Sequence, residues 1–182
     1  MTKTKKLTII FVLLASIVGL FVVGFFVLRD RTVWQSYTSE QLGFSVLIPD
    51  SWKIEEENPP SGPDIMIIDK NSLAFIRVRG MTDLAINSME MIDSSISRYK
   101  NKLAQQDGHS VADFSTENIS ETVKEFTLSG EFPVNDVIYR YEERGQIATD
   151  GRVIIMRATD TPEDFTQSII AMRKITDSFK LQ

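Results

Sequence analysis

Hydrophobic and polar residues follow different periods along this chain, and each period predicts a different kind of element. The first segment has no alternation at all, because residues 7–28 form an apolar run of 22 residues without a charged side chain. At about 1.5 Å rise per residue, a helix of this length spans roughly 33 Å, which is enough for a hydrocarbon core of ~30 Å. The run therefore predicts a transmembrane helix.

Charged residues on either side of the run predict its orientation. Three lysines precede it within residues 1–6, whereas Arg29 and Arg31 follow it and are offset by Asp30. Lysine and arginine favour the cytoplasmic side of a membrane, so we expect the N-terminus inside and the rest of the chain outside. The two arginines leave the opposite orientation open.

A cleavable signal peptide is the alternative to a retained anchor. Such a peptide has an apolar region of about 7–15 residues, followed by a small-x-small cleavage site. Here the run is longer, and Ile17 and Val22 stand where sites ending at Gly19 and Gly24 require a small residue. We therefore expect a signal-anchor and divide the chain into a cytoplasmic basic tail (1–6), a transmembrane helix (7–28), a short linker (29–36) and an extracytoplasmic domain (37–182).

The first half of this domain has the period of β-strands. Residues 42–49 read as a strand that follows a glycine and ends at a proline, and residues 55–64 read as an exposed, proline-rich loop. Two further apolar runs, 64–69 and 73–80, flank a Lys-Asn-Ser turn and predict a hairpin.

The period then changes to that of a helix and changes back. Apolar residues recur every three or four positions from Ile86 to Leu103, which predicts a helix of about 20 residues capped by Thr82 or Asp83 and ending before Gly108. Three long strands follow at 122–132, 137–147 and 153–159, the last of them apolar on both faces and therefore central in a sheet. A second helix begins after Thr161. The fold class that these elements predict is α+β, an antiparallel sheet covered by helices.

The order of these elements resembles that of the PsbP-like family. The resemblance covers residues 36–182 and rests on Tyr37, a glycine-Phe strand at 42–49 that ends in proline, Trp52, the helix after 77–80, the late three-stranded meander and the closing Ser178-Phe179. It implies an α/β/α sandwich around an antiparallel sheet. Known members in photosynthetic organisms are non-catalytic extrinsic subunits that stabilise photosystem II, and a eukaryotic relative binds a small GTPase.

One departure from the family limits what the resemblance implies. The photosystem members dock through an N-terminal extension, whereas this chain has an expected membrane anchor at that place. The resemblance therefore implies a binding or accessory module and not a photosystem subunit.

Composition narrows the classes of partner. Residues 32–182 contain 15 Lys and Arg against 24 Asp and Glu, a formal charge of −9. Nucleic acid is excluded as an expected ligand, because its binding rests on neutralisation of phosphates by basic side chains. The chain has no cysteine, which excludes disulfides, thiol catalysis and thiolate metal sites.

The sequence offers only weak candidates for catalytic residues. We therefore expect no enzyme activity and no catalytic residue. His109 is the single histidine and lies in a polar loop, and the Ser97-x-x-Lys100 match lacks the other elements of the serine–lysine enzymes. No cofactor is expected. Carboxylates at residues 55–57 and 160–164 leave a Ca²⁺ or Mg²⁺ site open as an alternative.

These observations favour a membrane-anchored, non-catalytic module that binds an unknown membrane or envelope protein. The partner-contact residues that we expect are those of the proline-rich segment, where prolines pre-order the chain and acids mark it: Glu55, Glu56, Glu57, Pro59, Pro60 and Asp64. The alternative is a small domain that binds a ligand or divalent cation, or a hydrolase, with its pocket between helix and sheet.

Overall fold

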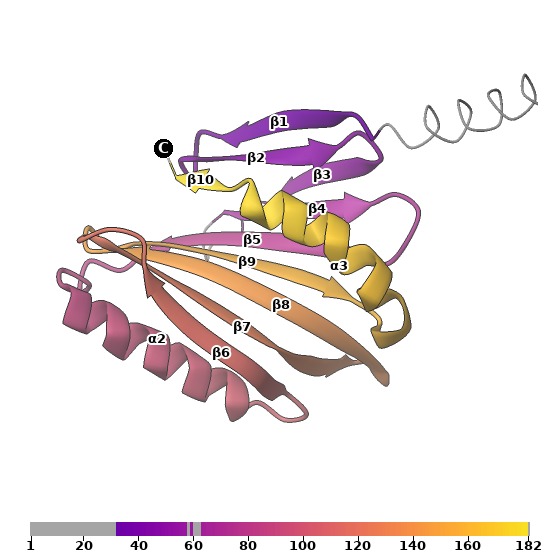
Figure 1. Ribbon diagram of the computed structural model, residues 1–182. Coiled ribbons are helices and arrows are strands. Elements are labelled where there is room, and N and C mark those ends of the chain that lie inside the picture. The colour runs from indigo at the N-terminus through magenta and orange to yellow at the C-terminus, as the bar shows by residue number, and fades with distance from the viewer. Residues whose placement is uncertain (1–31, 58, 60–62, 182) are drawn as a thin grey trace, which may run out of the picture. The chain divides into compact units, whose positions relative to one another are not determined.

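The computed structural model describes residues 32–57, 59 and 63–181 (Figure 1). The basic tail, the expected anchor at 7–28 and residues 29–31 of the linker lie outside this part of the chain. Neither helix of the described residues combines the length and the apolarity needed to cross a membrane. The elements are β1 (Trp34–Ser39), β2 (Phe44–Pro49), β3 (Trp52–Glu57), β4 (Asp64–Asp69), β5 (Phe75–Thr82), α2 (Met89–Ala104), β6 (Ser110–Asn118), β7 (Val123–Val134), β8 (Val137–Ala148), β9 (Arg152–Asp160), α3 (Pro162–Asp177) and β10 (Lys180–Leu181).

The strands form two antiparallel sheets. The larger has seven strands in the order β3-β4-β5-β9-β8-β7-β6, and the smaller has the order β1-β2-β10. The hairpins predicted from the sequence are all present: β4 pairs with β5, β7 with β8, and β8 with β9. This confirms the expected α+β class with a mostly antiparallel sheet.

Two tight turns account for the long meander. Asn135 and Asp136 connect β7 to β8 and both have positive φ, 48° and 67°, as a two-residue hairpin turn with the right twist requires. Gly151, at φ 88°, fulfils the same role between β8 and β9. These turns bring residues 123–160 together as three adjacent strands.

The helix α2 starts later than the sequence predicts. Its N-cap is Ser88, whose Oγ accepts a hydrogen bond from the Met91 N–H at 3.3 Å, and not Thr82 or Asp83. Asp83 is engaged otherwise: its carboxylate accepts from the Ala85 N–H, and its own N–H donates to the Gly151 carbonyl oxygen. This hydrogen bond to the β8–β9 turn keeps residues 83–87 outside the helix.

The helix α3 starts where the sequence predicts. Thr161 is its N-cap and Pro162 occupies its first turn, while Phe165, Ile169 and Met172 point into the core. At the other end the described chain continues into the short strand β10, which pairs with β2.

The two helices lie on opposite faces of the larger sheet (Figure 1). On one face, α3 and the smaller sheet pack against β4, β5 and β9, and on the other α2 packs against β7, β8 and β9. Strand β9 serves both cores, with Ile154 and Met156 in the first and Val153 and Ile155 in the second. The strand expected to be central and covered on both faces is therefore β9.

Three boundaries differ from the sequence-based expectation. Strand β1 begins at Trp34, inside the segment 29–36 that we expected as linker. Strand β3 runs through Glu57, so the acids of the expected loop 55–64 lie in a strand. Strand β6 was not predicted as a separate element.

A buried ion pair lies under α2. The Glu143 carboxylate accepts hydrogen bonds from the Tyr99 hydroxyl at 2.9 Å and from Arg157 Nε at 2.5 Å. Burial raises the pKa of Glu143, and Arg157 and Tyr99 oppose this shift. The Arg157 guanidinium lies 4.7 Å from the ring centroid of Tyr141. This cluster joins α2, β8 and β9.

Removing the basic partner should destabilise the domain strongly. In Arg157→Ala the Glu143 side chain, 1% exposed, is left without its cation, and we expect the free energy of unfolding to fall by about 3 kcal/mol. Lys53→Ala, which breaks an exposed pair with Glu55, is the matched control and should cost at most about 1 kcal/mol. Urea unfolding of both variants measures this. Equal losses would contradict a structural role for the buried pair.

Candidate functional site

A groove runs between α3 and the strands β6, β7 and β8, on the sheet face that α3 covers only in part. One cavity in it has a volume of about 520 Å³, and a second of about 600 Å³ shares Asp113, Ser129, Glu142, Ile169 and Arg173 with the first. The two cavities are therefore adjacent, and we call them together the α3 groove.

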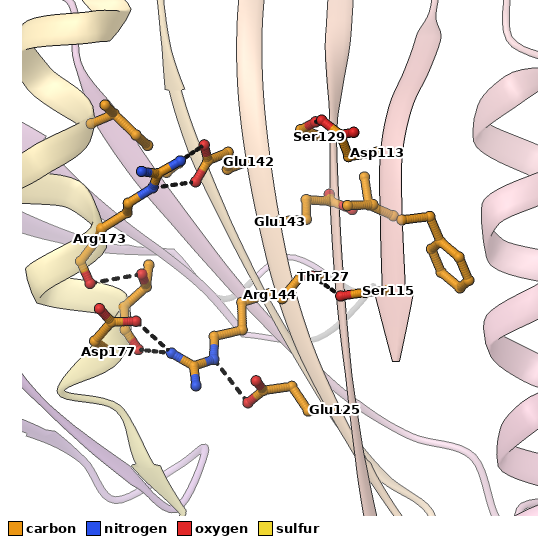
Figure 2. A pocket seen from close by; sticks show the side chains of 15 residues that line it. Asp113, Ser115, Glu125, Thr127, Ser129, Glu142, Glu143, Arg144, Arg173 and Asp177 are labelled. Atoms are coloured by element: carbon orange, nitrogen blue, oxygen red, sulfur yellow. Dashed lines mark hydrogen bonds and ion pairs between the residues drawn. The ribbon is translucent and has the colours of Figure 1, made fainter. Parts of the chain in front are cut away.

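The floor of the α3 groove follows from the strand register. Ser115 on β6 lies opposite Thr127 on β7, which lies opposite Arg144 on β8. Side chains that are directly opposite in an antiparallel sheet share a face. Ser115, Thr127 and Arg144 therefore form a polar row across the three strands. The labelled polar side chains of the floor and of α3 are seen in Figure 2: Asp113, Ser115, Glu125, Thr127, Ser129, Glu142, Arg144, Arg173 and Asp177.

Two arginines connect α3 to the floor (Figure 2). Arg173 on α3 donates from Nε to the Glu142 carboxylate at 2.9 Å. Arg144 on β8 donates from Nη1 to Asp177 at 2.8 Å and forms an ion pair through Nε with Glu125, also at 2.8 Å. These contacts fix the position of α3 over the sheet.

The carboxylates raise the pKa of both arginines. Burial lowers the pKa of Arg144, but hydrogen bonds and attraction from Glu125 and Asp177 outweigh it and raise the pKa above its ordinary value. The hydrogen bonds that Arg173 donates to the Glu142 carboxylate likewise raise the pKa of Arg173. Both guanidinium groups are therefore charged at physiological pH.

Hydroxyl groups and one acid complete the floor. Ser115 and Thr127 share a hydrogen bond of 2.7 Å, and the Ser129 hydroxyl donates to the Asp113 carboxylate at 3.1 Å. Among the described residues Asp113 has no basic partner, unlike Glu125 and Glu142. The groove therefore offers a carboxylate that accepts from a hydroxyl but has no ion-pair partner among the described residues, which suits a basic group or another hydrogen-bond donor.

The candidate catalytic residues of the sequence lie elsewhere. His109 stacks on the Phe132 ring at 5.5 Å, and Lys100 lies over the ring of Phe114 at 4.4 Å. Within residues 32–57, 59 and 63–181, no three histidine or carboxylate side chains are arranged to hold a metal ion.

The sequence-predicted contact residues are not brought together as one loop. Glu55, Glu56 and Glu57 extend along β3, and Glu56 accepts a hydrogen bond from the Tyr37 hydroxyl. Burial, together with Glu56, raises the pKa of Tyr37 to about 12. Pro59 is half-buried, and Pro60 lies outside the described residues.

Asp64 differs from the expectation most clearly, because it is buried and paired. The Arg77 Nε–H is shared between the two carboxylate oxygens of Asp64, at 2.9 and 2.8 Å, and Arg77 Nη2 and Arg79 Nε donate to the same carboxylate. Burial raises the pKa of Asp64, but the two arginines outweigh it and hold the pKa below its ordinary value of 3.8. A side chain in this position supports the sheet and is not free to contact a partner.

The α3 groove was not predicted as a site, although one signal for it was present. The alternation in residues 137–147 places Arg140, Glu142 and Arg144 on one face of the middle strand, and these residues line the groove. The sequence does not say which face α3 covers.

Comparison with known proteins gives a fold but no close relative. No protein-family model matches the chain, and no curated protein matches it in sequence. The solution structure of cyanobacterial PsbP (CyanoP) from Synechocystis sp. PCC 6803 superposes with a TM-score of 0.59 at 13% identity, over 83% of this chain and 94% of that one. The fold is PsbP-like. The resemblance expected from the sequence is thus confirmed at the level of the fold.

Two further solved structures share the fold. LpqN of Mycobacterium tuberculosis, described as involved in cell envelope biogenesis, has a TM-score of 0.53 at 13% identity, over 86% of this chain and 95% of that one. The Ran-binding protein Mog1p of Saccharomyces cerevisiae has a TM-score of 0.51 at 7% identity, over 82% and 96%. Proteins described by binding and by envelope biogenesis thus share this architecture.

The buried position of Asp64 predicts a pH-dependent stability. Because its pKa is lower in the folded state than in the unfolded chain, its stabilisation is present above pH 3.8 and is lost as the pH falls below that value. Asp64→Asn should lower the free energy of unfolding by about 2 kcal/mol at neutral pH, and this loss should shrink toward about pH 3.

Urea unfolding of Asp64→Asn and wild type at several pH values measures this difference. The control is Glu57→Gln, the exposed cross-strand neighbour of Asp64, which should change stability by at most about 0.5 kcal/mol at any pH. A loss in Asp64→Asn that does not depend on pH would contradict the assigned role of the two arginines.

Proposed function

We propose that this chain is a single-pass membrane protein whose extracytoplasmic domain binds a partner protein of the membrane or envelope through the α3 groove, without catalysis. The observation that carries the proposal is the groove itself, a polar surface between α3 and β6–β8 in which the Asp113 carboxylate has no basic partner among the described residues. The anchor at residues 7–28 would hold this surface close to the membrane.

Preorganisation supports a binding role for the α3 groove. Arg144 and Arg173 already hold α3 against the sheet, so a partner would not have to order the wall of the site. Association loses less free energy to conformational ordering when the surface is fixed beforehand.

Charge supports a partner with basic side chains. Asp113, Glu125, Glu142 and Asp177 face only two arginines in the cavity of about 520 Å³, and the domain as a whole carries −9. An acidic surface raises the rate of encounter with a basic one and disfavours acidic partners. The groove therefore fits a partner segment that presents a lysine or arginine to Asp113.

The shared fold supports the class of function and nothing finer. LpqN and Mog1p are described by envelope biogenesis and by Ran binding, and CyanoP is a PsbP. An accessory or binding module is consistent with all three descriptions.

A small polar ligand is the second candidate for the same site. The volume of about 520 Å³ lies within the range of small-molecule pockets, and hydroxyls and carboxylates line it. A ligand of this class would bind the purified protein directly, whereas a protein partner is captured from membranes.

Charge reversal in the groove tests the proposed function. We expect full-length protein, solubilised in mild detergent from its native membrane, to retain a specific partner protein, and Asp113→Lys to reduce the amount captured at least about tenfold. The intact mass of the captured chain tests whether residues 1–28 are retained.

The matched control is Glu57→Lys, which places the same charge reversal on β3, in the surface expected from the sequence. It should leave capture unchanged. Loss of capture in Glu57→Lys and not in Asp113→Lys would contradict the groove as the site and would favour the β3 surface. Capture of no partner by wild type would contradict the proposed function itself.

A further inference from the structure

The hairpin between β7 and β8 projects beyond the rest of the sheet. The pairing of β6 with β7 ends at Ser110 and Glu131, and the pairing of β8 with β9 starts at Arg140 and Asp160. Residues 132–139, which we call the hairpin tip, therefore pair only with each other. In Figure 1 this tip is the end of β7 and β8 that extends past β9.

The hairpin tip is apolar where solvent-exposed hairpins are ordinarily polar. Six of its eight residues are Phe, Pro, Val, Ile or Tyr, and the other two are Asn135 and Asp136, which the positive-φ turn requires. Val134 and Val137 are each 43% exposed and Ile138 is 53% exposed. Val134 and Val137 are paired across the hairpin and Ile138 lies on its other face, so the end of this projecting hairpin exposes apolar side chains on both faces.

Aromatic side chains pack together at the base of the hairpin. The Phe132 ring stacks on Tyr139 at 5.8 Å and on His109 at 5.5 Å, and it meets the edge of Tyr141 at 5.8 Å. This stack fixes the hairpin tip relative to the sheet. The hairpin tip could therefore enter a lipid surface without a rearrangement of the domain.

The hairpin tip lies at the end of the domain where the chain enters. Figure 1 places the start of β1 and the β7–β8 turn at the same end of the sheet, and the loop between β5 and α2 at the other end. The β4–β5 turn, which carries the exposed Leu73, lies at the first end, and the loop between β5 and α2, which carries the exposed Leu84, lies at the second. Only residues 29–33 separate β1 from the apolar run, and five residues reach at most roughly 18 Å.

We infer that the hairpin tip inserts into the lipid surface beside the anchor. This inference rests on the anchor in the proposed function. Val134, Val137 and Ile138 would enter the boundary between headgroups and acyl chains, and Tyr139 would lie at the level of the headgroups, where tyrosine is favoured. Three aliphatic side chains bind a membrane weakly by themselves, but the anchor keeps them at high effective concentration.

The absence of cysteine from the sequence makes a direct test possible. In full-length protein reconstituted in phosphatidylcholine vesicles, Ile138→Cys provides a single site for an environment-sensitive fluorophore. We expect lipids with a quencher on the acyl chain to quench this fluorophore at least about twofold more than the same fluorophore at Leu84→Cys, which is 84% exposed at the other end.

A second labelled variant controls for the fluorophore itself. With the label at Val137→Cys, the additional changes Val134→Ser and Ile138→Ser should lower quenching to the level at Leu84→Cys. Equal quenching at Ile138 and Leu84 in protein that floats with the vesicles would overturn tip insertion and leave the anchor intact. Protein that does not float with the vesicles would overturn the anchor and with it this inference.

Discussion

The width of the seven-stranded sheet is the constraint on which the rest of this structure depends. Six spacings of about 4.8 Å make the sheet roughly 29 Å wide, whereas a helix with its side chains is about 10 Å across. One helix on each face covers two or three strands and leaves the others without a helix. The helices α2 and α3 cover different strands, and β9, in the middle of the sheet, is the strand that both cores share.

The uncovered parts of the two faces are stabilised by polar contacts in place of helices. Beside α3, hydroxyls and carboxylates occupy the floor of β6–β8, and Arg144 and Arg173 connect it to the helix. On the opposite face, Arg77 and Arg79 hold the buried Asp64. The binding surface that we propose is thus a consequence of the incomplete cover, because a third helix at that place would bury the α3 groove.

Much of the fold could be predicted because its signals are local. The change of period at Ile86, the Asp150-Gly151 turn and the Thr161-Pro162 helix start each depend on residues that are close in sequence. The predicted start of α2 was wrong because the Asp83 N–H donates to the carbonyl oxygen of Gly151, which is distant in sequence. Ser88 caps the helix in place of Asp83. A capping residue cannot be chosen from local sequence when a distant strand turn competes for it.

The sites could be predicted less well for the same reason. Three consecutive glutamates before a proline-rich segment resemble a loop, yet pairing with β4 makes them the edge strand β3. Asp64 is buried because Arg77 and Arg79 arrive on the neighbouring strand, and a pairing of that kind is uncertain from sequence. The α3 groove depends on which strands α3 crosses, and this is a long-range property. The polar face of β8 indicates only that one face of this strand is not in the apolar core.

Site-specific photo-crosslinking in the native membrane tests the central claim most directly. A photoreactive amino acid would replace Ser115 on the floor of the α3 groove, and in a second protein it would replace Glu57 on β3. The account predicts a discrete crosslinked adduct with a partner protein from position 115 and none from position 57. An adduct from position 57 alone would contradict the groove as the binding surface, and the absence of any adduct would contradict a stable partner at the membrane.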